Sequence, residues 1–179
     1  MLTPEIRQQI TALVRHWVVP AMGCTEPICV AHATAKATEI LGTTPVKVEA
    51  LLSANILKNA MGVGIPGTGM VGLHIASALG AVCGKSSYGL EVLNDLDDNA
   101  IAKAKKMVED SVVTVALAET SKKLYVKAII TDSCGHTASS LIVDDHDNIA
   151  ETSFGEEILT SSQKDEVVVE QKNTLDYHL

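Results

Sequence analysis

The chain has 179 residues, with 22 acidic against 14 basic side chains and a net charge of −8. Hydrophobic residues make up 46% of the chain but aromatic residues only 3%, so the sequence can bury a core of mostly aliphatic side chains. The acidic balance and the scarcity of stacking side chains argue against nucleic acid and anionic membranes as partners.

Helical patterns dominate the first 109 residues. Thr3 and Pro4 form a helix start, and apolar residues then recur at helical spacing until Pro20. We expect further helices over residues 26–41, 70–81 and 97–108. An alternating segment over residues 45–52 predicts a strand whose buried face carries Val46, Val48, Ala50 and Leu52.

The pattern changes to strands near residue 110. Alternation predicts strands over residues 112–117, 124–131, 138–143 and 149–154. The expected class is α+β: a helical N-terminal lobe (1–109) with a Gly-rich loop, a small and mostly antiparallel β-rich lobe (110–160), and a polar tail (161–179). With no signal segment and no membrane-spanning apolar run, a cytoplasmic location is expected.

The four cysteines show no disulfide or zinc-ligand spacing. Cys29 and Cys83 are expected to be buried free thiols. Cys24 is different because it stands in a Gly-Cys-Thr-Glu-Pro segment, just before the second helix. The positive end of that helix dipole favours a thiolate, as a reactive or metal-binding cysteine requires. The alternative, a capping turn that happens to contain cysteine, is equally compatible with the sequence.

Two polar segments follow the predicted strand. Residues 53–59 supply Ser53, Asn55, Lys58 and Asn59, which together can hold a carboxylate, although a helix start with a solvated lysine explains them too. The glycine stretch that contains Gly67, Thr68 and Gly69 matches a dinucleotide fingerprint over residues 62–67, but it does not directly follow a strand and no βαβ unit surrounds it. It predicts either a loop that wraps a small anion or a structural turn.

The histidines do not cluster in the sequence. His32 and His74 fall in predicted helices, where core or surface roles are the ordinary ones. His136 precedes a predicted strand and is a candidate to line a cleft, with a structural role as the more frequent alternative.

Residues 22–28, residues 53–59 and the loop at 62–72 together resemble three blocks of the iron–sulfur L-cysteine desulfidase family. More distantly, His136-Thr137 resembles an element of iron–sulfur L-serine dehydratases. The resemblance implies a lyase that releases sulfide, pyruvate and ammonia from L-cysteine, with a [4Fe–4S] cluster as Lewis acid. It implies Cys24 as catalytic residue or cluster neighbour, and a substrate pocket formed by Thr25, Glu26, Ser53, Asn55, Lys58, Asn59, Gly67, Thr68, Gly69 and His136.

The chain departs from that family in length and in cysteines. It has no C-terminal set of cluster ligands, so we expect neither cluster nor activity in this chain alone. The expected partners are a small amino-acid substrate and a C-terminal half or second subunit, and a homo-oligomer is compatible with the sequence. The alternatives are an L-serine dehydratase-like lyase, or a catalytically silent domain that binds a small carboxylate or serves as a partner subunit.

Overall fold

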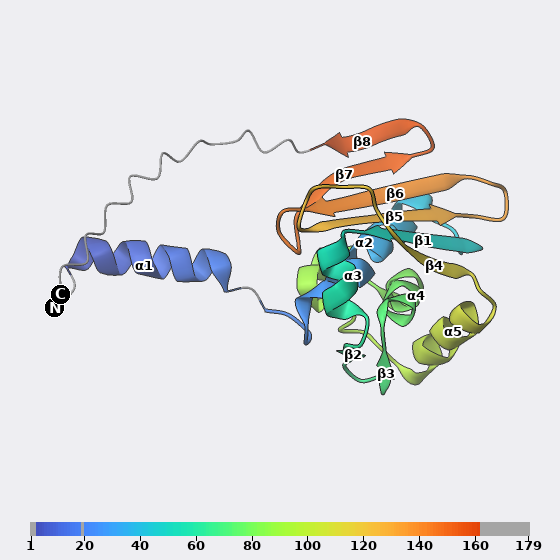
Figure 1. The fold of residues 1–179 in the computed structure, drawn as a ribbon, viewed down its shortest axis with the longest axis horizontal. Coiled ribbons are helices and arrows are strands. Elements are labelled where there is room, and N and C mark those ends of the chain that lie inside the picture. The colour runs from blue at the N-terminus through green and yellow to red at the C-terminus, as the bar shows by residue number, and fades with distance from the viewer. Residues whose placement is uncertain (1–2, 19, 162–179) are drawn as a thin grey trace.

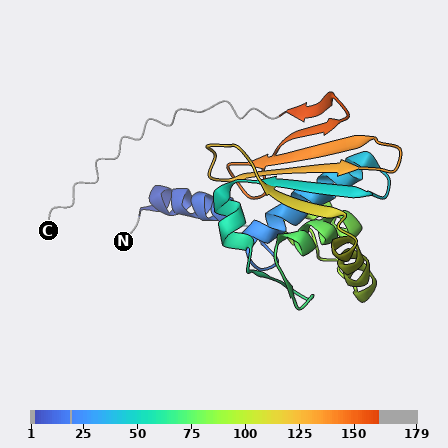
Figure 2. The same ribbon diagram turned by 45° about the vertical axis from the view of Figure 1, so that its right-hand side comes forward.

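The computed structural model describes residues 3–18 and 20–161. One mixed sheet carries helices on one of its faces, and α1 stands apart from this body (Figures 1 and 2). The elements are α1 (Pro4–Trp17), α2 (Thr25–Leu41), β1 (Lys47–Leu52), α3 (Ala54–Ala60), β2 (Gly64–Ile65), β3 (Met70–Val71), α4 (Leu73–Cys83), a 3₁₀ helix η1 (Ser86–Glu91), α5 (Asp98–Glu109), β4 (Val113–Leu117), β5 (Tyr125–Thr131), β6 (Thr137–Val143), β7 (Ile149–Phe154) and β8 (Glu157–Ser161).

The six-stranded sheet has the order β4-β1-β5-β6-β7-β8. β1 pairs in parallel with β4, and every other neighbouring pair in this sheet is antiparallel. The expected α+β class with a mostly antiparallel sheet is therefore confirmed. β1, from the first half of the chain, lies between β4 and β5, so the sheet joins residues on both sides of position 109.

Helix α2 lies at the centre of the molecule. It packs on β5 and β6 on one side and on α4 on the other, and every residue from Pro27 to Ala35 is buried. Such a helix needs apolar side chains all round, which explains why residues 27–37 are almost continuously small or aliphatic. The surfaces it covers include the alternate residues Val126, Ala128 and Ile130 of β5, all of them fully buried.

Glycines bring α4 unusually close to α2. A Cβ at Gly80 would stand 2.3 Å from the carbonyl oxygen of Ala31, and one at Gly84 would stand 2.6 Å from Ala35 Cβ. The two glycines are one helical turn apart, as are the two alanines, so they form matching flat strips. Because glycine has no side chain, Gly80 and Gly84 set the short distance between the two helices.

Most of the expected helices and strands are present, with corrections at their ends. α1 starts with Thr3 as N-cap, and α2 ends at Gly42, as predicted. The helix expected from residue 70 begins at Leu73 instead, because Met70 and Val71 form β3 and pair with β2. Val46 was expected on the buried face of its strand but is 50% exposed, since it precedes β1.

Several short elements were not predicted from the sequence, namely β2, β3, η1 and β8, whereas α3 agrees with the helix start that was one of the two interpretations of residues 53–59. The predicted tail lies outside the described residues except for Ser161. None of the helices among the described residues combines the length and the apolar character that crossing a bilayer requires.

The contact between α2 and α4 predicts the effect of one methyl group. Gly80→Ala should lower the free energy of unfolding by about 1–3 kcal/mol, because the added Cβ overlaps the Ala31 backbone and outweighs the gain in helix propensity. Urea unfolding followed by circular dichroism measures this change. Gly62→Ala is the control, since a Cβ there meets nothing within 4 Å. Equal unfolding midpoints for the two variants would show that the helices are not in close contact.

Candidate metal centre

Cys24 lies at the start of α2, as the sequence predicted; it is the N-cap residue itself, and it is exposed. Its side chain makes no capping hydrogen bond. Thr25 and Glu26 follow in the first turn, where the Thr25 hydroxyl lies 3.5 Å from a Glu26 carboxylate oxygen. The thiol therefore stands at a helix start, without a described hydrogen bond that would engage it.

The polar residues after β1 divide into structural and exposed ones. Ser53 is buried, caps α3, and donates its hydroxyl to the Lys123 carbonyl at 2.8 Å. Asn55, Lys58 and Asn59 are exposed. Asn59 donates to Glu26 at 3.4 Å, which links α3 to the start of α2.

The glycine loop also lies near the start of α2. A Cβ on Gly23 would stand 2.7 Å from Pro66 Cγ, so the Gly23 backbone lies against the Pro66 ring. Thr68 holds the loop together, because its hydroxyl donates to the Ile65 carbonyl and accepts from the Met70 amide. Gly67 and Gly69 flank Thr68 with positive φ angles of 78° and 64°.

The three predicted blocks thus come together in part. Contacts join Glu26 to Asn59 and Gly23 to Pro66. Among the described residues, no hydrogen bond or ion pair joins Lys58 to Cys24 or to the glycine loop. The shared pocket around Cys24 remains a prediction.

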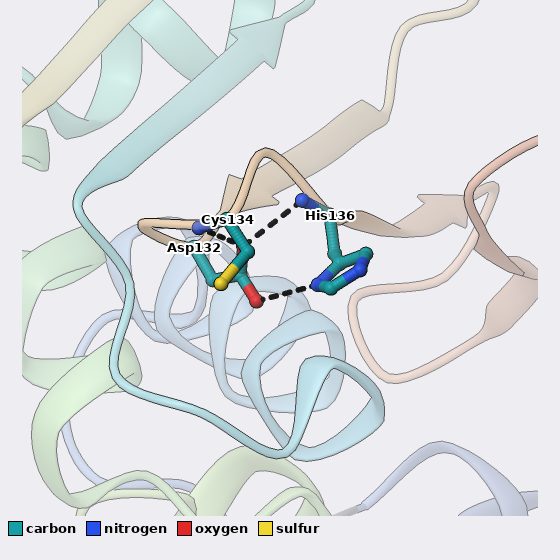
Figure 3. Close-up of side chains that lie close together, drawn as sticks. All are labelled: Asp132, Cys134 and His136. Atoms are coloured by element: carbon teal, nitrogen blue, oxygen red, sulfur yellow. Dashed lines mark hydrogen bonds and ion pairs between the residues drawn. The ribbon is translucent and has the colours of Figure 1, made fainter.

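A tighter cluster forms in the turn between β5 and β6. The Gly135 amide donates to the Asp132 carbonyl at 3.1 Å, and the Asp132 amide donates to the His136 carbonyl at 3.0 Å. Aspartate at the first position and glycine at the fourth, here with φ +85°, are the residues that such a turn favours. The turn brings together donor atoms of Asp132, Cys134 and His136, all within 4.8 Å of one another (Figure 3).

The Asp132 carboxylate is the fixed member of this cluster. Its Oδ1 accepts the backbone amides of Cys134 at 2.8 Å and His136 at 2.9 Å. Its Oδ2 lies 2.9 Å from His136 Nδ1 and accepts a weaker bond from the Thr43 hydroxyl at 3.4 Å. The His136 side-chain bond, followed by these backbone bonds, holds the pKa of Asp132 below its usual range. The carboxylate is therefore negatively charged and has one orientation.

Cys134 and His136 are exposed, whereas Asp132 is buried. The imidazole ring of His136 lies between Asp132 and the ring of Phe154, with the two ring centroids 6.1 Å apart. In Figure 3 Nδ1 is the ring nitrogen that faces Asp132, and the other ring nitrogen points away from the sulfur. A nucleophilic triad requires that other nitrogen beside the thiol, so a metal centre is the better interpretation.

A cleft of about 670 Å³ lies next to this turn, between the C-terminal ends of α2 and α4 and helix α5. Thr43 lines the cleft and also donates its hydroxyl to Asp132, so this residue contacts both the cleft and the carboxylate. Its other polar lining includes Glu39 and Lys103. None of the three donor residues lines the cleft itself, so Thr43 is the described link between the cleft and the turn.

Of this cluster the sequence predicted only His136, and as a substrate contact. The cysteine spacing gave no zinc pattern, so Asp132 and Cys134 were missed. The available signal was three metal-binding residue types within five positions, together with the Asp and Gly that favour a tight turn.

The fold and the turn define a class: an α+β domain with a candidate mixed-donor metal centre. The chain is similar to UPF0597 proteins. It is 51% identical to one from Phocaeicola vulgatus, in a match that covers 91% of this chain and 38% of the relative. It is 46% identical to one from Bacteroides fragilis, in a match that covers 99% of this chain and 42% of the relative. A relative from Parabacteroides distasonis is 52% identical, in a match that covers 87% of this chain and 36% of the relative. The chain thus spans about two fifths of the length of these relatives.

These relatives correct the family that the sequence motifs suggested. None of their names mentions a cysteine desulfidase, a lyase or an iron–sulfur protein. The expected identity as the N-terminal part of an L-cysteine desulfidase is contradicted, together with the lyase function and the alternatives attached to it. No family model matches the chain, and no solved structure matches it.

The four thiols differ in their surroundings, which predicts their order of alkylation. Cys29 is fully buried, and burial raises its pKa far above the usual range. Burial also raises the pKa of the half-buried Cys83 to about 11, with Asp97 and Asp95 adding to the effect. Iodoacetamide at neutral pH should therefore label Cys24 and Cys134 first, Cys83 slowly, and Cys29 only on unfolding.

Mass spectrometry of quenched time points measures this order. The sequence places Cys24 ahead of Cys134, because only Cys24 stands at a helix start. The same reaction in 8 M urea is the control, where all four thiols should react at similar rates. Early labelling of Cys29 in the folded protein would contradict the buried position of α2.

Proposed function

We propose that the turn between β5 and β6 binds one transition-metal ion of the Zn²⁺ class through Asp132, Cys134 and His136. The convergence of carboxylate, thiol and imidazole donors within 4.8 Å supports this function. Zn²⁺ accepts all three donor types, whereas Mg²⁺ and Ca²⁺ require oxygen ligands. The donor set therefore selects a borderline ion over the hard ones.

Binding an ion would require only small movements of the three donor side chains. In a tetrahedral site the ligand atoms lie roughly 3.3–3.6 Å apart, given bonds of about 2.0–2.3 Å to the ion. The present spread of up to 4.8 Å would contract as the exposed Cys134 side chain turns inward. The 2.9 Å contact of Asp132 with His136 Nδ1 would lengthen as the ion replaces the proton between them.

The surroundings of Asp132 suit a metal ligand. Two backbone amides hold Oδ1 and the Thr43 hydroxyl reaches Oδ2, so the carboxylate is oriented before an ion arrives. Hydrogen bonds to a ligand from outside the coordination sphere orient that ligand and tune the ion. The exposed Cys134 and His136 leave the site open for an ion to enter.

Three protein ligands leave one tetrahedral position for water or a bound molecule, the arrangement found in catalytic rather than closed structural zinc sites. The neighbouring cleft with Glu39 and Lys103 is linked to this site through Thr43, which lines the cleft and reaches Asp132. The proposed function is therefore an open metal centre beside a small-molecule cleft.

Co²⁺ titration of the reduced chain tests the centre, because Co²⁺ bound to thiolate gives characteristic absorption bands. We expect one Co²⁺ per chain, displaced by Zn²⁺. Cys134→Ser and His136→Gln should each weaken binding about a hundredfold or more, since even outer-shell changes cost 10- to 100-fold. Cys134→Ser should also remove the thiolate bands.

Cys24→Ser and His74→Gln are the matched controls, because both residues are exposed and lie on α2 and α4 rather than in the turn. Both should bind Co²⁺ as the unchanged chain does. Thiolate bands that persist in Cys134→Ser, or that vanish in Cys24→Ser, would assign the site elsewhere and overturn the proposal.

A further inference from the structure

Helix α1 has an apolar stripe on which no other element of the described residues packs. Ile6, Ile10, Leu13 and Val14 recur at helical spacing and are 42–58% exposed. Every described side chain of the helix is exposed, and the ribbon shows α1 clear of the sheet and of the other helices (Figures 1 and 2). The stripe therefore contributes nothing to the core of the described part of the chain.

A helix of this kind requires a partner to be stable. Isolated helices of about 12–15 residues are marginal in water, and α1 has 14 residues. Its polar face does not compensate, because neither Arg7 nor Arg15 forms an ion pair among the described residues. These two are the only arginines of an otherwise acidic chain.

We propose that α1 docks, through Ile6, Ile10, Leu13 and Val14, onto the region that longer proteins of this kind carry outside the matched part. The Bacteroides fragilis relative matches 99% of this chain, α1 included, yet the match covers only 42% of that relative. More than half of such a protein is therefore available as a partner surface. The surface that fits is an apolar groove bordered by carboxylates, which would face Arg7 at the edge of the stripe.

A second copy of the chain fits the stripe less well. A helix of 14 residues is roughly 21 Å long, so its stripe covers roughly 200 Å². Stable interfaces between separate proteins bury about 800 Å² per partner. Two copies, each with a net charge of −8, would also repel one another. A groove on the same polypeptide needs much less area, because the tether replaces the cost of association.

Hydrogen exchange on two proteins tests the docking. In this chain the α1 amides should exchange within seconds. In the full-length Bacteroides fragilis protein the aligned segment should exchange at least 100-fold more slowly. Glutamate at the position aligned with Leu13 should abolish that protection in the long protein, while Leu13→Glu should leave the melting temperature of this chain unchanged.

Gln8→Glu is the matched control, since it adds the same charge to the same helix on the face opposite the stripe. The aligned change should leave the protection in the long protein intact. Equally fast exchange in both proteins would overturn the proposal. So would a dimer of this chain that Leu13→Glu dissociates, seen by light scattering, or binding of this chain to anionic phosphatidylserine vesicles that Leu13→Glu abolishes.

Discussion

The close contact of α2 with α4 is the constraint on which the rest of the domain depends. Helix α2 has the sheet on one side and α4 on the other, so any change in its distance from α4 moves it relative to β5 and β6. Gly80 and Gly84 set that distance by having no side chains where Ala31 and Ala35 approach. Because cores are close-packed, this spacing cannot adjust without opening a void or an overlap.

Both ends of α2 carry candidate chemistry, so the same constraint positions both. Its start presents Cys24 beside α3 and the glycine loop, through the contacts of Glu26 with Asn59 and of Gly23 with Pro66. Its end passes through Gly42 to Thr43, whose hydroxyl reaches Asp132 in the β5–β6 turn. The carboxylate is thus held from two directions, by its own turn and by the end of the buried helix.

Much of the fold could be predicted because its signals are local. Thr3 and Gly42 mark helix ends by their own chemistry, and Val48, Ala50 and Leu52 alternate in the sequence because one face of β1 is buried. β8 was missed since all five of its residues are exposed, which leaves no alternation to detect. The candidate metal centre was missed for another reason: Asp132 becomes a shared acceptor only once the turn closes at Gly135, which the spacing of the cysteines alone does not encode.

The Asp132 carboxylate has two roles that need not compete. As an acceptor it stabilises the turn through Oδ1, which binds two backbone amides. As a metal ligand it would use Oδ2, whose present partners are the exchangeable proton at His136 Nδ1 and the weak Thr43 bond. An ion can replace the first partner without breaking the amide bonds that shape the turn. Because one oxygen stabilises the turn and the other would bind the ion, the turn can keep its shape with and without a bound ion. This arrangement suits reversible metal binding better than a fold that depends on zinc.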